Sequence, residues 1–140
     1  FNPTVVSYAD AIGLMQLIEP TAKSNALDMG ITDFERDQLY KPAINVQLGS
    51  HYLAKLIAHY AGEAVPAIAA YNAGEHKVDP WLKRARRPDK HVELDYFVED
   101  IPFEQTRNYV KGVVSSWARY AYLEKPGKDW PLELSLRAKL

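Results

Sequence analysis

The chain has 140 residues, the length of one domain, and its 47% hydrophobic content is sufficient for a substantial core. Its 17 Lys and Arg residues nearly balance its 18 Asp and Glu residues, which argues against a strongly basic nucleic-acid-binding surface and against an acidic disordered tail. It contains no cysteine, which excludes disulfides, thiolate metal ligands and a cysteine nucleophile.

The N-terminal third of the sequence predicts short helices separated by turns. Pro20 suits the first position of a helix, and Gly30 suits the left-handed residue just past a helix end. Thr32 followed by Glu35 has the spacing of a capping box, which predicts that another short turn opens at Thr32.

The middle of the sequence predicts two more helices. From Ile44 to Tyr60, apolar and aromatic side chains recur every three or four residues, which is typical of an amphipathic helix that Gly62 can end. Pro66 is expected to start a short apolar helix, and Gly74 is expected to close it.

The C-terminal half predicts two further helices and contains one ambiguous segment. Asp79 suits an N-cap with Pro80 at the first helical position, and the longest helix is expected from about Phe103 to Tyr122. Polar and apolar residues alternate over residues 91–97 (HVELDYF), which also allows a short β strand there. The predicted fold class is therefore mostly α, with room for one very short β element.

Several common chemistries are not supported by any motif. The four histidines are His51, His59, His76 and His91. They are dispersed and do not form the zinc motif HExxH, so we expect no metal site. The serine-hydrolase motif GxSxG and a Gly-rich phosphate loop are also absent from the sequence, and no cofactor is expected. The basic run at 83–90 is more consistent with a solvated helix end than with an interaction site.

Three unusual motifs remain: GLMQ at 13–16, AAYNAG at 69–74 and VEDIPF at 98–103. Each has an ordinary structural explanation by itself. Gly13 can make a turn, the Asn-Ala-Gly run can cap a helix C-terminus, and the acidic pair can favour a helix N-terminus. Their occurrence together and in this order points to a specific family.

The chain resembles the catalytic domain of the soluble lytic transglycosylases, lysozyme-like enzymes that cleave bacterial peptidoglycan. The resemblance begins with FNP at 1–3, continues through the three motifs and the NVQLGSHYLAKLI segment, and ends near Tyr120. It implies a lysozyme-like α-helical fold, with a catalytic domain at 1–124 that lacks its N-terminal edge and a C-terminal tail at 125–140.

The resemblance places the catalytic acid upstream of the sequence. The family pattern opens with Glu-Ser, one variable residue, and then an aromatic residue followed by Asn-Pro, which Phe1, Asn2 and Pro3 match. The catalytic Glu is therefore expected three positions before Phe1. The sequence is accordingly expected to be a processed or excised part of a longer chain, or one whose first residues were not recorded.

Three residues near the N-terminus match substrate-binding positions of the family. Ser7 matches a loop serine that contacts the substrate or helps to orient the acid. Met15 and Gln16 match residues that line the cleft, where the Gln amide hydrogen-bonds to sugar. Ile18-Glu19-Pro20 departs from the usual Met-Pro, and Asp10 stands where the family usually has Gly.

Three further residues match substrate-binding positions in the second half of the chain. Tyr71 and Asn72 match a pair whose Tyr hydroxyl points towards the acid and the cleaved sugar. Glu99 matches an acidic residue that faces the cleft and is linked to the stem peptide. Glu75 departs from the family, in which Pro is common after the AYNAG motif.

These matches imply a lytic transglycosylase that cleaves the bond between N-acetylmuramic acid and N-acetylglucosamine. One Glu would protonate the leaving oxygen and then act as base while the muramyl 6-hydroxyl attacks its own anomeric carbon, which forms a 1,6-anhydro product. A lysozyme-type hydrolase of the same fold and a peptidoglycan-binding module without catalysis remain alternatives. The implied partners are glycan strands, stem peptides and other domains of a longer parent protein, without nucleic acid. The implied location is the bacterial periplasm or cell envelope.

Overall fold

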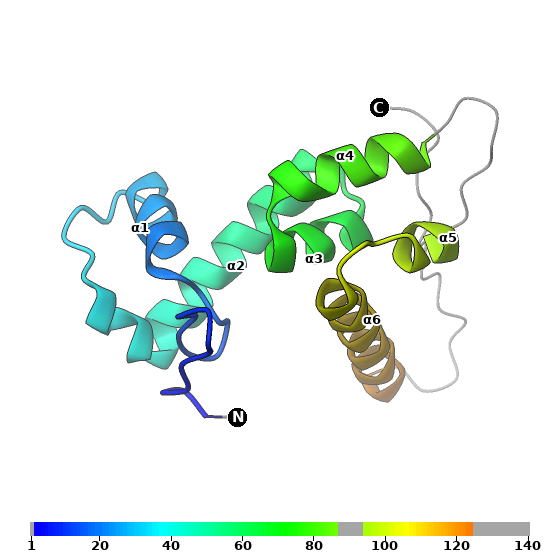
Figure 1. The fold of residues 1–140 in the computed structure, drawn as a ribbon. Coiled ribbons are helices and arrows are strands. Elements are labelled where there is room, and N and C mark those ends of the chain that lie inside the picture. The colour runs from blue at the N-terminus through cyan, green and yellow to red at the C-terminus, as the bar shows by residue number, and fades with distance from the viewer. Residues whose placement is uncertain (1, 87–93, 125–140) are drawn as a thin grey trace. The chain divides into compact units, whose positions relative to one another are not determined.

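The computed structural model describes residues 2–86 and 94–124, which are mostly helical, as the sequence predicts (Figure 1). The chain divides into two compact units, residues 1–55 and residues 56–140. The helices are α1 (Glu19–Asp28), the 3₁₀ helix η1 (Arg36–Tyr40), α2 (Pro42–His59), α3 (Ala64–Ala73), α4 (Glu75–Ala85), α5 (Leu94–Glu99) and α6 (Glu104–Glu124).

Extended structure in the described ranges is limited to two isolated antiparallel bridges, Val6 with Ile12 and Ile12 with Leu17. The segment 91–97, for which the sequence allowed a short β strand, forms none in its described residues. Its first three residues lie outside the described residues, and its last four belong to α5. Alternation over so few residues cannot distinguish a strand from a single helical turn, which is why the sequence left this segment ambiguous.

The first helices begin close to their predicted positions, but the capping box lies three residues later than predicted. Pro20 is the second residue of α1, and Gly30 follows the helix end with a φ of 76°. The box predicted at Thr32 is wrong, because Glu35 is the N-cap of η1 and exchanges reciprocal hydrogen bonds with Gln38. A capping box is defined by a three-residue spacing, which the Glu35–Gln38 pair satisfies equally well.

α3 is the buried centre of the second unit. Its residues 65–70 are all buried, and α3 packs against both α4 and α6. The small alanine side chains of this helix allow its neighbours to approach closely. Pro66 lies in the first turn and not at the first position, which is tolerated because backbone N–H groups there have no partner within the helix. Gly74, with a φ of 86°, closes α3 as predicted.

The predicted helix start at Asp79 is wrong. α4 begins at Glu75, directly after Gly74, and Pro80 lies inside the helix. Asp79 is used in a tertiary contact, since its Oδ1 accepts a hydrogen bond from the Tyr60 hydroxyl at 2.9 Å. A local capping rule cannot detect that use, because it considers only residues adjacent in sequence.

The two ends of the α3–α4 pair are both fixed. At one end, Gly74 is the C-cap of α3 and also the N-cap of α4. At the other end, the N-cap of α3, Glu63, forms an ion pair with the C-cap of α4, Arg86, and both side chains are largely buried. The α3–α4 pair is therefore connected at one end by a peptide link and at the other by a buried ion pair.

Candidate active site

The six predicted substrate-binding residues fall into two groups, one in each unit. The group in the first unit lies in the hydrogen-bonded loop of residues 5–17, which precedes α1. The group in the second unit lies at the ends of α3 and α5. The first contains Ser7, Met15 and Gln16, and the second contains Tyr71, Asn72 and Glu99.

The GLMQ motif forms a tight turn in the 5–17 loop. Ile12 and Leu17 exchange backbone hydrogen bonds of 2.9 and 3.1 Å, and this pairing closes the turn over the residues between them. Gly13 has a φ of 78° and Gln16 a φ of 50°, both in the left-handed region. For Gln16 this conformation is strained, and strain of this kind is common where a loop presents functional side chains.

Asn45 of α2 holds this turn in place, a role that the motifs in the sequence did not predict. Its fully buried amide accepts a hydrogen bond from the Met15 N–H at 2.7 Å and donates to the Ile12 and Leu39 carbonyls, each at 2.9 Å. A sequence signal did exist, because Asn45 shares a helix face with the buried Leu48 and Gly49. A polar residue on an apolar face usually serves a buried hydrogen bond.

The Met15 side chain packs against α2 at Gly49. A Cβ atom at Gly49 would lie 2.5 Å from the Met15 Cβ, so the helix accepts this loop only because residue 49 has no side chain. Met15 is half-buried, which is compatible with its predicted place in a cleft wall.

The Gln16 side chain is used within the loop. Its Nε2 donates to the Gly13 carbonyl at 2.9 Å and to the Val5 carbonyl at 3.4 Å. The resemblance to the lytic transglycosylases implied that this amide hydrogen-bonds to sugar. The structure shows that the Gln16 side-chain nitrogen closes the turn. Gln16 therefore stabilises the loop, whether or not it also contacts the substrate.

Ser7 and Asp10 shape the other side of the same loop. The Ser7 Oγ accepts a hydrogen bond from the Ala11 N–H at 3.1 Å, and Ser7 N–H donates to the Ala11 carbonyl at 2.8 Å. Asp10 has a φ of 61°, a conformation that glycine adopts most easily, and the family usually has glycine there. Both Asp10 carboxylate oxygens accept 2.6 Å hydrogen bonds from Arg36, which lower the Asp10 pKa.

Tyr71 and Asn72 occupy the last turn of α3, next to the closing Gly74. Tyr71 is half-buried and Asn72 is exposed. The Asn72 Oδ1 accepts a hydrogen bond from the hydroxyl of Thr106 at 2.8 Å. Thr106 is buried in the first turn of α6, and no motif had singled it out.

Glu99 is an ionised, exposed carboxylate at the end of α5. Its Oε1 lies 2.6 Å from the Lys111 Nζ, and this hydrogen bond lowers the Glu99 pKa. It does not sit at a helix N-terminus, which was the ordinary structural explanation. A carboxyl group whose pKa is lowered is a poor general acid near neutral pH.

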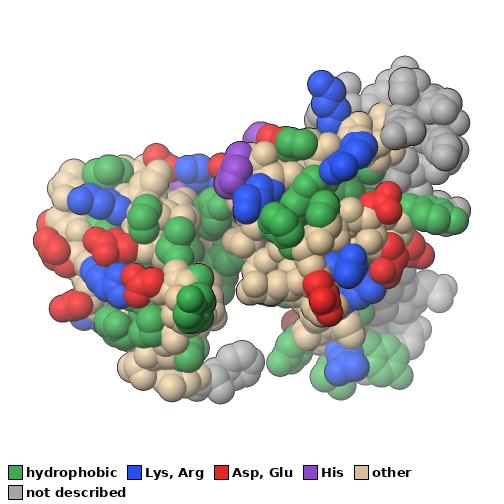
Figure 2. Space-filling view, in the orientation of Figure 1, with side chains coloured by type: hydrophobic (Ala, Val, Ile, Leu, Met, Phe, Trp, Pro, Cys, Tyr) green, Lys and Arg blue, Asp and Glu red, His purple; other side chains and the backbone are tan. Residues whose placement is uncertain are grey.

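Neither a metal cluster nor a membrane span occurs in the described part of the chain. No three His, Cys, Asp or Glu side chains within residues 2–86 and 94–124 gather to hold a metal ion. Within the same ranges, no helix has the length and apolar character needed to cross a membrane. Acidic and basic side chains are interspersed on the visible surface, in keeping with the near-zero net charge (Figure 2).

Comparison with known proteins identifies close relatives. The transglycosylase SLT domain model matches residues 1–94, which include the GLMQ and AYN motifs. The chain is 36% identical to a soluble lytic murein transglycosylase of Salmonella typhimurium over 87% of this chain, and 35% identical to that of Escherichia coli over 90%. It spans only 19% and 20% of those two proteins.

Two solved structures have the same fold. One is an inactive mutant of the lytic transglycosylase Slt from Pseudomonas aeruginosa, at 35% identity and a TM-score of 0.84, covering 100% of this chain and 22% of that chain. The other is a 70-kDa soluble lytic transglycosylase in complex with bulgecin A, at 34% identity and a TM-score of 0.83, covering 98% and 21%.

Proposed function

Because the chain belongs to the transglycosylase SLT domain family, we propose that it is the catalytic part of a peptidoglycan lytic transglycosylase. The observation that carries the proposal is the family match over residues 1–94, in which the hydrogen-bonded GLMQ turn and the Tyr71–Asn72 pair both lie. Since the chain spans about a fifth of the relatives named above, this activity is proposed for the longer protein.

The proposed reaction uses one carboxyl group, the Glu expected three positions before Phe1. It would protonate the glycosidic oxygen between N-acetylmuramic acid and N-acetylglucosamine, and would then accept the proton of the muramyl 6-hydroxyl as that oxygen attacks the anomeric carbon. The Pseudomonas aeruginosa relative supports an essential glutamate, because its inactive form replaces one glutamate by glutamine.

The six substrate-binding residues keep their roles as part of the proposal. Ser7 would contact the substrate or help to orient the acid. Met15 and Gln16 would line the cleft from the strained loop, with the Gln16 amide hydrogen-bonding to sugar. Tyr71 and Asn72 would contact the sugars next to the cleaved bond. Glu99 would face the stem peptide, and its lowered pKa supports a binding role over a proton-donating one.

The proposed partners and location follow from the same family. The partners are peptidoglycan glycan strands, stem peptides and the remaining domains of a longer parent protein. The location is the bacterial periplasm or cell envelope. Residues 1–124 would form the catalytic domain and 125–140 a C-terminal tail, the latter outside the described residues.

The product of the reaction tests the proposal. We expect the chain extended before Phe1 by Glu-Ser-Ala to release muropeptides ending in 1,6-anhydro-N-acetylmuramic acid from purified sacculi, as measured by mass spectrometry. The matched control carries Gln-Ser-Ala and should release none. Reducing-end products would favour the hydrolase, in which a second carboxylate activates water. Binding without any product would favour the inactive binding module.

A further inference from the structure

The hydrogen bond between Thr106 and Asn72 joins a residue outside the predicted site to one inside it. Asn72 lies in the last turn of α3 and Thr106 in the first turn of α6, and the two helices pack together. The Thr106 side chain is buried, whereas Asn72 is exposed. Its hydroxyl donates to the Asn72 Oδ1 at 2.8 Å.

We infer that Thr106 is a positioning residue that fixes the Asn72 amide so that its nitrogen is presented to the substrate. The inference rests on the proposed function, in which Asn72 contacts sugar. An amide carries its oxygen and nitrogen on opposite sides of the same carbon. When the oxygen is held by the buried Thr106 hydroxyl, the nitrogen is the amide atom left to meet the substrate. Asn72 then offers two N–H donors, which suit an acceptor such as the carbonyl oxygen of an N-acetyl sugar.

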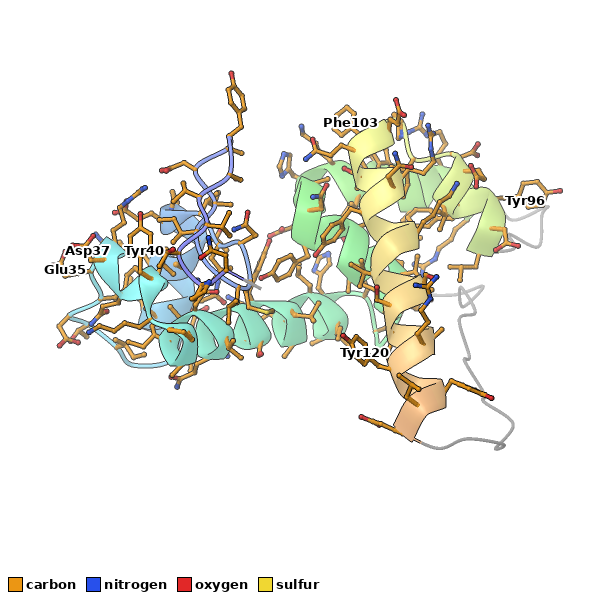
Figure 3. All side chains as sticks on the ribbon, turned by 90° about the horizontal axis from the view of Figure 1, so that it is seen from below. Glu35, Asp37, Tyr40, Tyr96, Phe103 and Tyr120 are labelled. Carbon is orange, nitrogen blue, oxygen red and sulfur yellow. The ribbon has the colours of Figure 1, made fainter. Side chains whose placement is uncertain are left out.

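The start of α6 is anchored well enough to hold Thr106 in place. Phe103, labelled just before α6 in Figure 3, packs edge-on against Trp81 of α4 at 5.3 Å between ring centroids. The ammonium of Lys77 lies 4.6 Å from the Phe103 ring centroid. Arg107 donates hydrogen bonds to the carbonyls of Glu99 and Ile101, at 3.2 and 3.1 Å. These contacts fix the first turn of α6 against both α4 and the end of α5.

The opposite amide orientation is the competing arrangement. A hydroxyl can accept as well as donate, so Thr106 could in principle face the Asn72 nitrogen. Asn72 would then present an acceptor oxygen and would not bind a sugar carbonyl. Replacing the hydroxyl by a methyl group removes the preference for either orientation, while the buried volume is kept.

The binding test uses four forms of the 140-residue chain: the parent, Thr106→Val, Asn72→Ala and the double variant. The probe is a peptide-free tetrasaccharide of alternating N-acetylglucosamine and N-acetylmuramic acid, and Kd is measured by calorimetry. We expect Thr106→Val to bind the tetrasaccharide roughly three- to tenfold more weakly, which corresponds to the loss of one hydrogen bond between Asn72 and the sugar. In the Asn72→Ala background, the same change should have no further effect. Thr106→Ser should bind as the parent does, and so should Thr32→Val, an exposed control.

Three binding results overturn the inference. An equal loss from Thr106→Val in both backgrounds would mean that Thr106 acts through general stability, which thermal melting of each variant would reveal. Parent-like binding by Thr106→Val would mean that the hydroxyl does not orient the amide. Parent-like binding by Asn72→Ala would remove the contact on which Thr106 is argued to act, while the glycan function itself would stand.

A measurement without sugar keeps the inference separate from the proposed function. We expect the side-chain NH₂ signals of Asn72 in a ¹⁵N spectrum to shift or broaden in Thr106→Val and to stay in place in Thr106→Ser. If the parent does not bind the tetrasaccharide, the proposed glycan function fails for this chain, and the NH₂ signals alone decide the positioning role. Unchanged Asn72 signals in Thr106→Val would overturn it.

Discussion

Left-handed backbone at single residues determines the shape of the GLMQ turn. Gly13 is the tightest example, since a Cβ atom there would lie 2.4 Å from the Asn45 amide nitrogen and 2.7 Å from the Leu39 carbonyl oxygen. Gly30 has nearly the same φ, 76° against 78°, but a Cβ atom there would meet nothing within 4 Å. The two glycines therefore separate the cost of conformation from the cost of crowding.

We predict that Gly13→Ala destabilises the fold much more than Gly30→Ala. Gly30→Ala should cost about 1–2 kcal/mol, the penalty of a left-handed L-residue. Gly13→Ala should cost ~3 kcal/mol or more, because displacement of Asn45 and a backbone carbonyl is added to that penalty. Urea denaturation of both variants measures the difference, and equal losses would mean that Asn45 moves aside without cost.

The ion pair of Glu99 gives a prediction about pH. The Lys111 ammonium holds the Glu99 pKa below its ordinary value of 4.5. A lowered folded-state pKa means that the pair stabilises the fold above the unfolded-state pKa and that this contribution is lost as the pH falls through the folded-state pKa. We expect an NMR titration of the Glu99 side-chain carboxyl carbon to have its midpoint below 4.5.

The matched control for that titration is Lys111→Met. Without the ammonium group, the Glu99 midpoint should rise towards 4.5, while the midpoint of Asp10, which pairs with Arg36, should not move. An unchanged Glu99 midpoint in Lys111→Met would show that the pair does not persist in solution.

At the scale of helices and loops, α2 supports the GLMQ turn through one side chain. We predict that Asn45→Ala costs about 3 kcal/mol of unfolding free energy, because the buried amide's three hydrogen bonds, from the Met15 N–H and to the Ile12 and Leu39 carbonyls, are all lost. Asn108→Ala, at an exposed position of α6, should change stability by less than about 0.5 kcal/mol. A loss as small as that of the control would mean that water replaces the Asn45 amide.

Helices were predictable from sequence where their limits depend on neighbouring residues. Gly62 and Gly74 end their helices at left-handed backbone, and the long helix at about 103–122 appears as α6. Asp79 was misassigned because its carboxylate bonds to Tyr60, a residue in another part of the chain.

The candidate site shows the same limit. The motifs give Met15 and Asn72, but the side chains that hold them, Asn45 and Thr106, act over about thirty residues of sequence separation. No spacing rule relates residues so far apart, and only the folded chain shows the contact.

For the molecule as a whole, binding and cleavage can be separated. We predict that the 140-residue chain by itself binds murein glycan strands but does not clear sacculi, since neither Asp10 nor Glu99 is suited to replace the expected upstream acid. Both carboxyl groups have lowered pKa values and are ion-paired. A turbidity assay against a heat-denatured control measures clearing, and co-sedimentation with sacculi measures binding. Clearing above that control would show that a carboxylate of this chain can serve as the acid.

The α3–α4 pair is joined at one end by Gly74 and at the other by the Glu63–Arg86 ion pair. This arrangement limits where the length of the chain can change during evolution. One residue inserted into α4 would rotate everything after it by about 100°, since a helix has 3.6 residues per turn. Arg86 would then leave Glu63, and a buried carboxylate would lose its counter-ion. An insertion at Gly74 would have the same effect from the other end. Related sequences should therefore vary in length before Glu63 and after Arg86, and should keep the number of residues between them constant.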